Sequence, residues 1–197
     1  MQAVAILKAD WCDPVAALAP FAEEPFALMV LSGGGGERGR WSYLLREPSR
    51  TLSVAADDPR DPFEALAGLL GPLERAHPDG PPFQGGVAGL AAYELGARVE
   101  PVPLARDPDW PDLVCAAYPA LLAFDHEVGE VVAVGRGETP AEADSRARFA
   151  LSWLTQKPPS PLRGGVGVGG AYSQASSRHP HPPAPSPQGG GGGRRFP

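Results

Sequence analysis

The sequence has few of the residues from which metal and catalytic sites are usually assembled. Its 197 residues include only two cysteines and four histidines. Cys12, Cys115, His77 and His126 are scattered along the chain, without the paired spacing of zinc ligands. The chain also lacks a G-x-S-x-G segment and a glycine-rich loop followed by G-K-[ST]. We therefore expect no metal site, and no set of catalytic residues can be assembled from the sequence.

Long apolar runs are missing as well. The longest runs, residues 26–31 and 116–124, are far shorter than the roughly 20 residues that a membrane-spanning helix needs. Residues 1–14 lack the basic start and the long apolar stretch of a secretion signal. We therefore expect a cytoplasmic protein with reduced thiols and no membrane segment.

Acidic residues are absent from the carboxy-terminal end of the chain. Residues 158–197 contain ten glycines and nine prolines, but no Asp or Glu. A segment of this composition buries too little apolar surface to offset its conformational entropy. We therefore predict a folded domain over residues 1–157 and a disordered, Pro/Gly-rich tail over residues 158–197.

The charge of the chain is also divided between these two parts. The chain has 17 Lys and Arg against 23 Asp and Glu, and the tail holds four of the arginines and none of the acids. Residues 1–157 therefore carry a net charge of −10. Contacts with phosphate groups require a basic surface. The acidic domain argues against nucleic acid as a partner.

Three places within residues 1–157 carry the signals of a helix start. In each, a residue type that caps helix amino termini precedes a proline, whose missing N–H costs nothing in the first turn. Glu142 also follows the third start at the spacing of a capping box. The three pairs are Asp13-Pro14, Asp61-Pro62 and Thr139-Pro140.

Apolar segments between these helices predict strands. They cover residues 25–32, 41–45, 50–56, 85–95 and 117–135. The last segment predicts a hairpin that turns at residues 125–129. Runs that are so continuously apolar suit strands covered on both faces. Because helices and strands do not alternate regularly, we predict the α+β class with mostly antiparallel pairing.

A glycine cluster interrupts the strand predicted at residues 85–95. Glycine inside a strand usually marks a bulge or the close approach of another backbone or of a ligand. The residues alone favour packing over ligand binding. We take as one structural motif Gly85, Gly86, Gly89, Tyr93 and Glu94, the last two at the expected exposed end of the strand.

Five segments occur in an order that has a parallel in a known family. They are LSGGGGERGRWSYLLREP at 31–48, DPFEAL at 61–66, PPFQGGVAGLAAYELG at 81–96, WPDL at 110–113 and AYPALLAFDHEVGEVVAVG at 117–135. This series resembles the amino-terminal region of aminodeoxychorismate synthase component I, and less closely that of anthranilate synthase component I. The resemblance covers about residues 26–154 and implies a two-sheet, sandwich-like domain.

The resemblance also implies a function. Members of this family join chorismate with ammonia, which a glutamine amidotransferase partner delivers, in a Mg²⁺-dependent step that leads to p-aminobenzoate and folate. The residues that hold chorismate and Mg²⁺ lie in a carboxy-terminal catalytic domain, so the resemblance implies no catalytic residue and no cofactor within this chain. It implies a truncated domain, inactive alone, whose partners are a glutamine amidotransferase subunit or the missing catalytic half.

A second hypothesis stays open beside this one. Some members bind tryptophan through a Leu-x-Ser or similar element, and Leu31-Ser32 occupies its place, with Leu31 where tryptophan-regulated members carry an acidic residue. The chain would then be a stand-alone module that binds an aromatic amino acid or docks on a glutamine amidotransferase. If the domain instead packs on a catalytic half, we expect uncovered apolar surface around residues 87–93 and 120–124.

Overall fold

The computed structural model describes residues 3–33, 36, 39–71, 76–100, 102–104 and 110–156. The tail predicted at residues 158–197 lies outside these ranges. Within them, the elements in chain order are β1 (Ala3–Asp10), α1 (Pro14–Leu18), η1 (Ala19–Phe21), β2 (Leu28–Val30), β3 (Trp41–Leu45), β4 (Arg50–Val54), α2 (Pro62–Leu70), β5 (Gly86–Ala91), η3 (Tyr93–Arg98), β6 (Leu113–Tyr118), β7 (Ala120–Asp125), β8 (Glu130–Gly137), α3 (Pro140–Ser152) and η4 (Trp153–Thr155), where η denotes a 3-10 helix.

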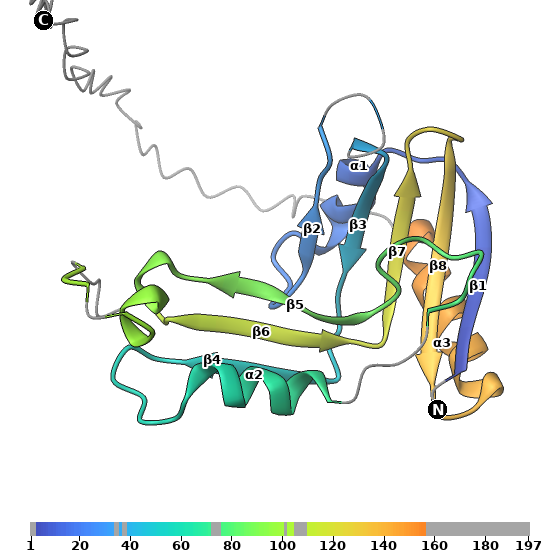
Figure 1. Ribbon diagram of the computed structural model, residues 1–197. Coiled ribbons are helices and arrows are strands. Elements are labelled where there is room, and N and C mark those ends of the chain that lie inside the picture. The colour runs from blue at the N-terminus through green and yellow to red at the C-terminus, as the bar shows by residue number, and fades with distance from the viewer. Residues whose placement is uncertain are drawn as a thin grey trace, which may run out of the picture. The chain divides into compact units, whose positions relative to one another are not determined.

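The strands form two antiparallel sheets. Sheet A has the strand order β1-β8-β7-β3-β2, and sheet B has the order β4-β6-β5. Every neighbouring pair in both sheets is antiparallel. Figure 1 shows the strands of sheet B running crosswise to those of sheet A. The prediction of an α+β fold with two mostly antiparallel sheets is confirmed.

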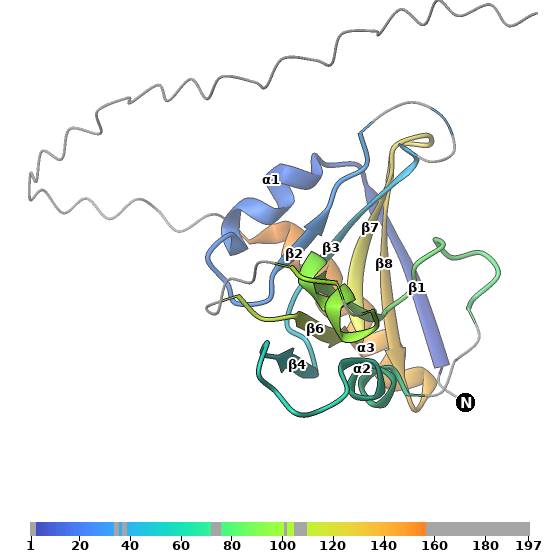
Figure 2. The ribbon, with the colours of Figure 1, turned by 60° about the vertical axis from the view of Figure 1, so that its left-hand side comes forward.

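Helices cover the outer faces of both sheets. The face of sheet A that carries Leu122 and Phe124 packs against α1, α3 and η4, and Figure 2 shows both α-helices on the side away from sheet B. The opposite face, which carries Leu121 and Ala123, packs against residues of sheet B. Helix α2 covers the outer face of sheet B, where Leu69 joins a cluster with Val54, Leu113 and Cys115. The layers are therefore helix, sheet, sheet, helix.

Strand β7 lies at the centre of this arrangement. All six of its residues are buried, because its two faces belong to two different hydrophobic clusters. The prediction that the continuously apolar run is covered on both faces is confirmed for this strand. The expectation of uncovered apolar surface around residues 120–124 is therefore wrong.

All three predicted helix starts are confirmed. The prolines at 14, 62 and 140 are the first residues of α1, α2 and α3, and the side chain of the preceding residue accepts a main-chain hydrogen bond in each case. The capping box differs in one detail. Thr139 Oγ1 accepts from the N–H of Glu142, but the Glu142 carboxylate accepts from the N–H of Glu138, one residue earlier than predicted.

The structure differs from the strand predictions in three places. Residues 3–10 form β1, which the sequence analysis did not predict, and β1 pairs with β8 along its whole length. The segment 117–135 begins in sheet B, crosses at Pro119 and continues in sheet A as the β7–β8 hairpin. Tyr93 and Glu94 belong to η3, so they do not lie at the end of a strand.

Among the helices of the described ranges, none is long and apolar enough to cross a membrane.

Candidate functional site

The predicted ligand-binding pair, Leu31 and Ser32, follows the edge strand β2. Leu31 is 55% exposed. The Ser32 hydroxyl donates a 2.6 Å hydrogen bond to the carbonyl of Trp41, and the Ser32 N–H donates to Ser42 Oγ at 3.0 Å. The hydroxyl and the N–H of Ser32 therefore tie the end of β2 to β3.

A serine and a histidine that the sequence analysis did not connect lie beside this pair. Ser42 Oγ lies 2.7 Å from His126 Nε2, and the His126 ring packs against Trp11 at 5.1 Å between ring centroids. A hydroxyl beside an imidazole is the arrangement of an activated nucleophile. Ser42, however, is completely buried. The contact therefore fixes the β3 start against the β7–β8 turn and offers no hydroxyl to a substrate.

The glycine motif packs against the chain's own backbone. Gly85 and Gly86 have φ of +98° and +128°, a region that favours glycine. A Cβ at Gly85 would lie 2.9 Å from the carbonyl oxygen of Tyr118, and one at Gly89 would lie 2.1 Å from that of Val114. These distances account for the glycines by close packing between β5, β6 and the loop before β5.

An apolar pocket lies between the β2 edge of sheet A and the inner face of sheet B. Its volume is about 240 Å³. The Tyr118 hydroxyl spans the gap by donating a 2.9 Å hydrogen bond to the carbonyl of Phe26. The residues that line the pocket are Phe26, Ala27, Leu28, Ala88, Gly89, Leu90, Val114, Cys115 and Tyr118. Neither Leu31 nor Ser32 is among them, although Gly89 of the glycine motif is.

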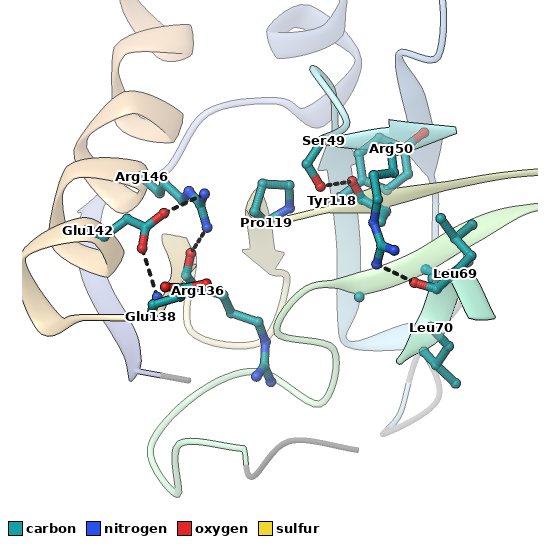
Figure 3. Close-up of a pocket in the computed structure, with 13 residues that line it drawn as sticks. Ser49, Arg50, Leu69, Leu70, Tyr118, Pro119, Arg136, Glu138, Glu142 and Arg146 are labelled. Carbon is teal, nitrogen blue, oxygen red and sulfur yellow. Dashed lines mark hydrogen bonds and ion pairs between the residues drawn. The ribbon is translucent and has the colours of Figure 1, made fainter. Parts of the chain in front are cut away.

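A second, polar cleft lies between the α2 end of sheet B and the β8–α3 connection (Figure 3). Its volume is about 270 Å³, and three arginines point from different elements toward it. Each of them donates to a main-chain carbonyl: Arg50 to Leu69, Arg136 to Gln84, and Arg146 to Arg136.

Acidic side chains accompany the arginines in this cleft. Glu142 pairs with Arg146 at 2.6 Å and accepts from the N–H of Glu138, so its two oxygens serve α3 and the turn before it. With three arginines and two glutamates at one seam, the charges are close to balance. The contacts indicate structural roles: Arg50 joins β4 to α2, and Arg136 and Arg146 join the loop before β5, β8 and α3.

The remaining carboxylates of interest are held in ion pairs. Burial by itself raises the pKa of the Asp125 carboxyl, but hydrogen bonds from Arg40 and from the N–H groups of Glu127 and Val128 outweigh burial and lower it. Hydrogen bonds from Arg60 bring the pKa of Asp58 down to about 2. These carboxylates stay charged at neutral pH and already have cationic partners.

The described residues also offer no set of metal ligands and no activated thiol. Among residues 3–156, apart from the undescribed gaps, no three His, Cys, Asp or Glu side chains come together in a way that could hold a metal ion. Cys12 and Cys115 are free, and burial raises the pKa of both thiols, with Asp13 adding to the effect at Cys12. A raised thiol pKa lowers the thiolate fraction and hence the reactivity.

Comparison of the sequence with known proteins gives consistent relatives, although no family model matches the chain. Anthranilate synthase component 1 of Thermus thermophilus is 34% identical over 79% of this chain and 36% of that protein. Aminodeoxychorismate synthase component 1 of Salmonella typhimurium is 31% identical over 71% of this chain and 33% of that protein. The chain therefore spans about a third of the length of the relatives it matches.

Comparison of the fold gives the same kind of neighbour. Anthranilate synthase component I of Streptococcus pneumoniae superposes with a TM-score of 0.51, over 75% of this chain and 36% of that one. The sequence identity is 17%, so this likeness concerns the fold alone.

Proposed function

Because this chain is homologous to the component I proteins of anthranilate synthase and aminodeoxychorismate synthase, we propose that residues 1–157 form the noncatalytic, amino-terminal domain of a chorismate-using synthase component I. The observation that carries the proposal is the extent of the match. Three comparisons each cover 71–79% of this chain but only 33–36% of the protein matched. The two curated relatives split between the anthranilate and the aminodeoxychorismate branches, and the proposal covers both.

In this proposal, the described residues provide a framework and another part of component I provides the chemistry. The described carboxylates do not fit a Mg²⁺ site, since Mg²⁺ takes oxygen ligands and no such cluster is present among the described residues. The two carboxylates with lowered pKa, Asp58 and Asp125, are engaged by arginines. The family's Mg²⁺ then belongs with the part that the match leaves out, and the glutamine amidotransferase that delivers ammonia stays a proposed partner of this chain beside that missing part.

The direct test is an assay of the full chain with chorismate, ammonium and Mg²⁺. We expect neither anthranilate nor aminodeoxychorismate to form, because the residues that the structure describes bring together no set of groups for the reaction. The Thermus thermophilus component 1, assayed under the same conditions with ammonium, is the positive control. Turnover by this chain alone would contradict the proposal that it is a noncatalytic domain.

The apolar pocket between the sheets favours a second candidate function, the binding of an aromatic amino acid. Its lining is apolar and carries no charged side chain, which suits an indole or phenyl ring. The charged groups of the amino acid would then meet main-chain groups or solvent at the open side. Leu90 lines this pocket and is 53% exposed, while Leu31 lies outside it and is 55% exposed.

This pair of leucines gives a matched test. If the pocket binds tryptophan, calorimetric titration of the full chain should show one binding site. Leu90→Asp should abolish binding, because it places a charge in the apolar lining. Leu31→Asp should preserve binding. Loss of binding in Leu31→Asp alone would move the site to the Leu31-Ser32 element. Absence of heat with the unaltered chain would remove this candidate function.

A further inference from the structure

An apolar groove lies on η3 and on the chain that follows it. The η3 groove has a volume of about 300 Å³ and is lined by Tyr93, Gly96, Val99, Glu100, Val102 and Leu104. Three of these side chains are large, apolar and open to solvent: Tyr93 is 84% exposed, Val99 66% and Val102 44%. Single exposed apolar residues are ordinary, but a contiguous group that lines a groove indicates an interaction surface.

The groove is built on a firmly held support. The Arg98 side chain donates to the Asp112 carboxylate at 2.8 Å and to the carbonyls of Ala55 and Asp58, each at 2.8 Å. On the same element, Leu95 is buried against the domain. Tyr93 and Val99, at the two ends of η3, are thus presented by a fixed backbone, which reduces the entropy lost on binding a partner.

Among the described residues, most of the broad apolar faces are covered; the pocket beside β2, where Leu90 is 53% exposed, is the exception. Sheet A lies between the α1 and α3 layer and sheet B, and α2 covers the outer face of sheet B. Figure 1 shows η3, in green, at the end of sheet B that lies away from α3. The exposed apolar surface at η3 is therefore accessible to a further protein domain.

We propose that the η3 groove is the surface on which the remaining part of a component I protein docks. This proposal rests on the proposed function. The shared fold accounts for 36% of the Streptococcus pneumoniae chain, so the rest of such a chain must pack on surfaces that this fold leaves open. Of the six lining residues, Glu100 is the charged one. The part that docks should therefore present an apolar surface with one cationic group that faces Glu100.

Binding in trans tests the proposal. The full chain is mixed with a separately produced segment of the Thermus thermophilus component 1 that lies outside the matched region, and affinity is measured by calorimetry. We expect a one-to-one complex. The double variant Tyr93→Ser/Val99→Ser should raise the Kd roughly tenfold or more, because it removes two central apolar anchors. The matched control is Phe63→Ser on α2, which removes a 47% exposed aromatic ring elsewhere and should leave the Kd unchanged.

The possible outcomes separate the two proposals. If the unaltered chain forms the complex and the double variant binds equally well, with a melting curve like that of the unaltered chain, the groove is not the docking surface and the proposed function stands. If neither the unaltered chain nor Phe63→Ser forms a complex, the docking proposal is overturned, while the proposed function is decided by the turnover assay. If the unaltered chain self-associates and the double variant does not, a second copy occupies the groove and the docking proposal is overturned.

Discussion

Replacing Gly135 with alanine should destabilise the domain by about 3 kcal/mol or more, because α3 packs directly on the backbone of β8 at this position. A Cβ at Gly135 would lie 2.2 Å from the carbonyl oxygen of Ala143 and 2.4 Å from the nitrogen of Ala147. Both are main-chain atoms within a helix, so neither can move without shifting α3. Urea denaturation of the full chain, followed by circular dichroism, measures the loss.

The close approach depends on small residues on both elements. Ala143, Ala147 and Ala150 of α3 are completely buried, and a Cβ at Gly137 of β8 would also lie 2.7 Å from the nitrogen of Ala143. A methyl group therefore has no space at this interface, although the same change is harmless elsewhere. The distance between helix and sheet is set by glycine and alanine, not by large side chains.

Gly68→Ala is the matched control for this prediction. Gly68 lies inside α2, and a Cβ there would meet nothing within 4 Å. Alanine is favoured over glycine in a helix interior by about 1 kcal/mol, so this variant should gain stability. If Gly135→Ala unfolds at the same urea concentration as the unaltered chain, the described packing of α3 on β8 is wrong.

The helix starts could be predicted because their signals are local. Asp13, Asp61 and Thr139 each accept hydrogen bonds from residues two or three positions along the chain, so a short window holds all the information. Strand β1 has no such signal. Its partner β8 lies more than a hundred residues away in the sequence, where Ala3 pairs with Gly137 and Asp10 with Glu130. A short apolar run does not by itself indicate which distant strand it joins.

The candidate sites could likewise be predicted only where their signals lie within one short segment. For the glycine motif the residues alone favour packing, because glycine within an apolar strand has few other uses, and Gly85 and Gly89 lie close to main-chain atoms of β6. The pocket between the sheets, however, takes its lining from three separated segments around residues 26–28, 88–90 and 114–118. The pairing of β5 with β6 and the position of sheet B beside sheet A bring these segments together. No pattern within one segment predicts that the pocket exists.

Replacing Arg98 with alanine should have the second large effect, and it connects stability with docking. Its guanidinium joins η3 to Asp112, which is 2% exposed, and to carbonyls of the loop after β4. Removing it takes a cationic partner from a buried carboxylate and leaves several carbonyls without this donor. We expect a loss of about 3 kcal/mol in the free energy of unfolding.

Two further variants make this prediction specific. Arg98→Lys should recover only part of the loss, because one ammonium group cannot reach Asp112 and the separate carbonyls together as the planar guanidinium does. Arg148→Ala, which removes an exposed α3 ion pair with Asp144, should have a free energy of unfolding close to that of the unaltered chain.

Since Arg98 holds η3 against the domain, Arg98→Ala should also weaken docking, although every lining residue of the η3 groove is intact. If Arg98→Ala behaves like Arg148→Ala in both measurements, η3 does not depend on this arginine, and the rigid support argued for the groove is wrong.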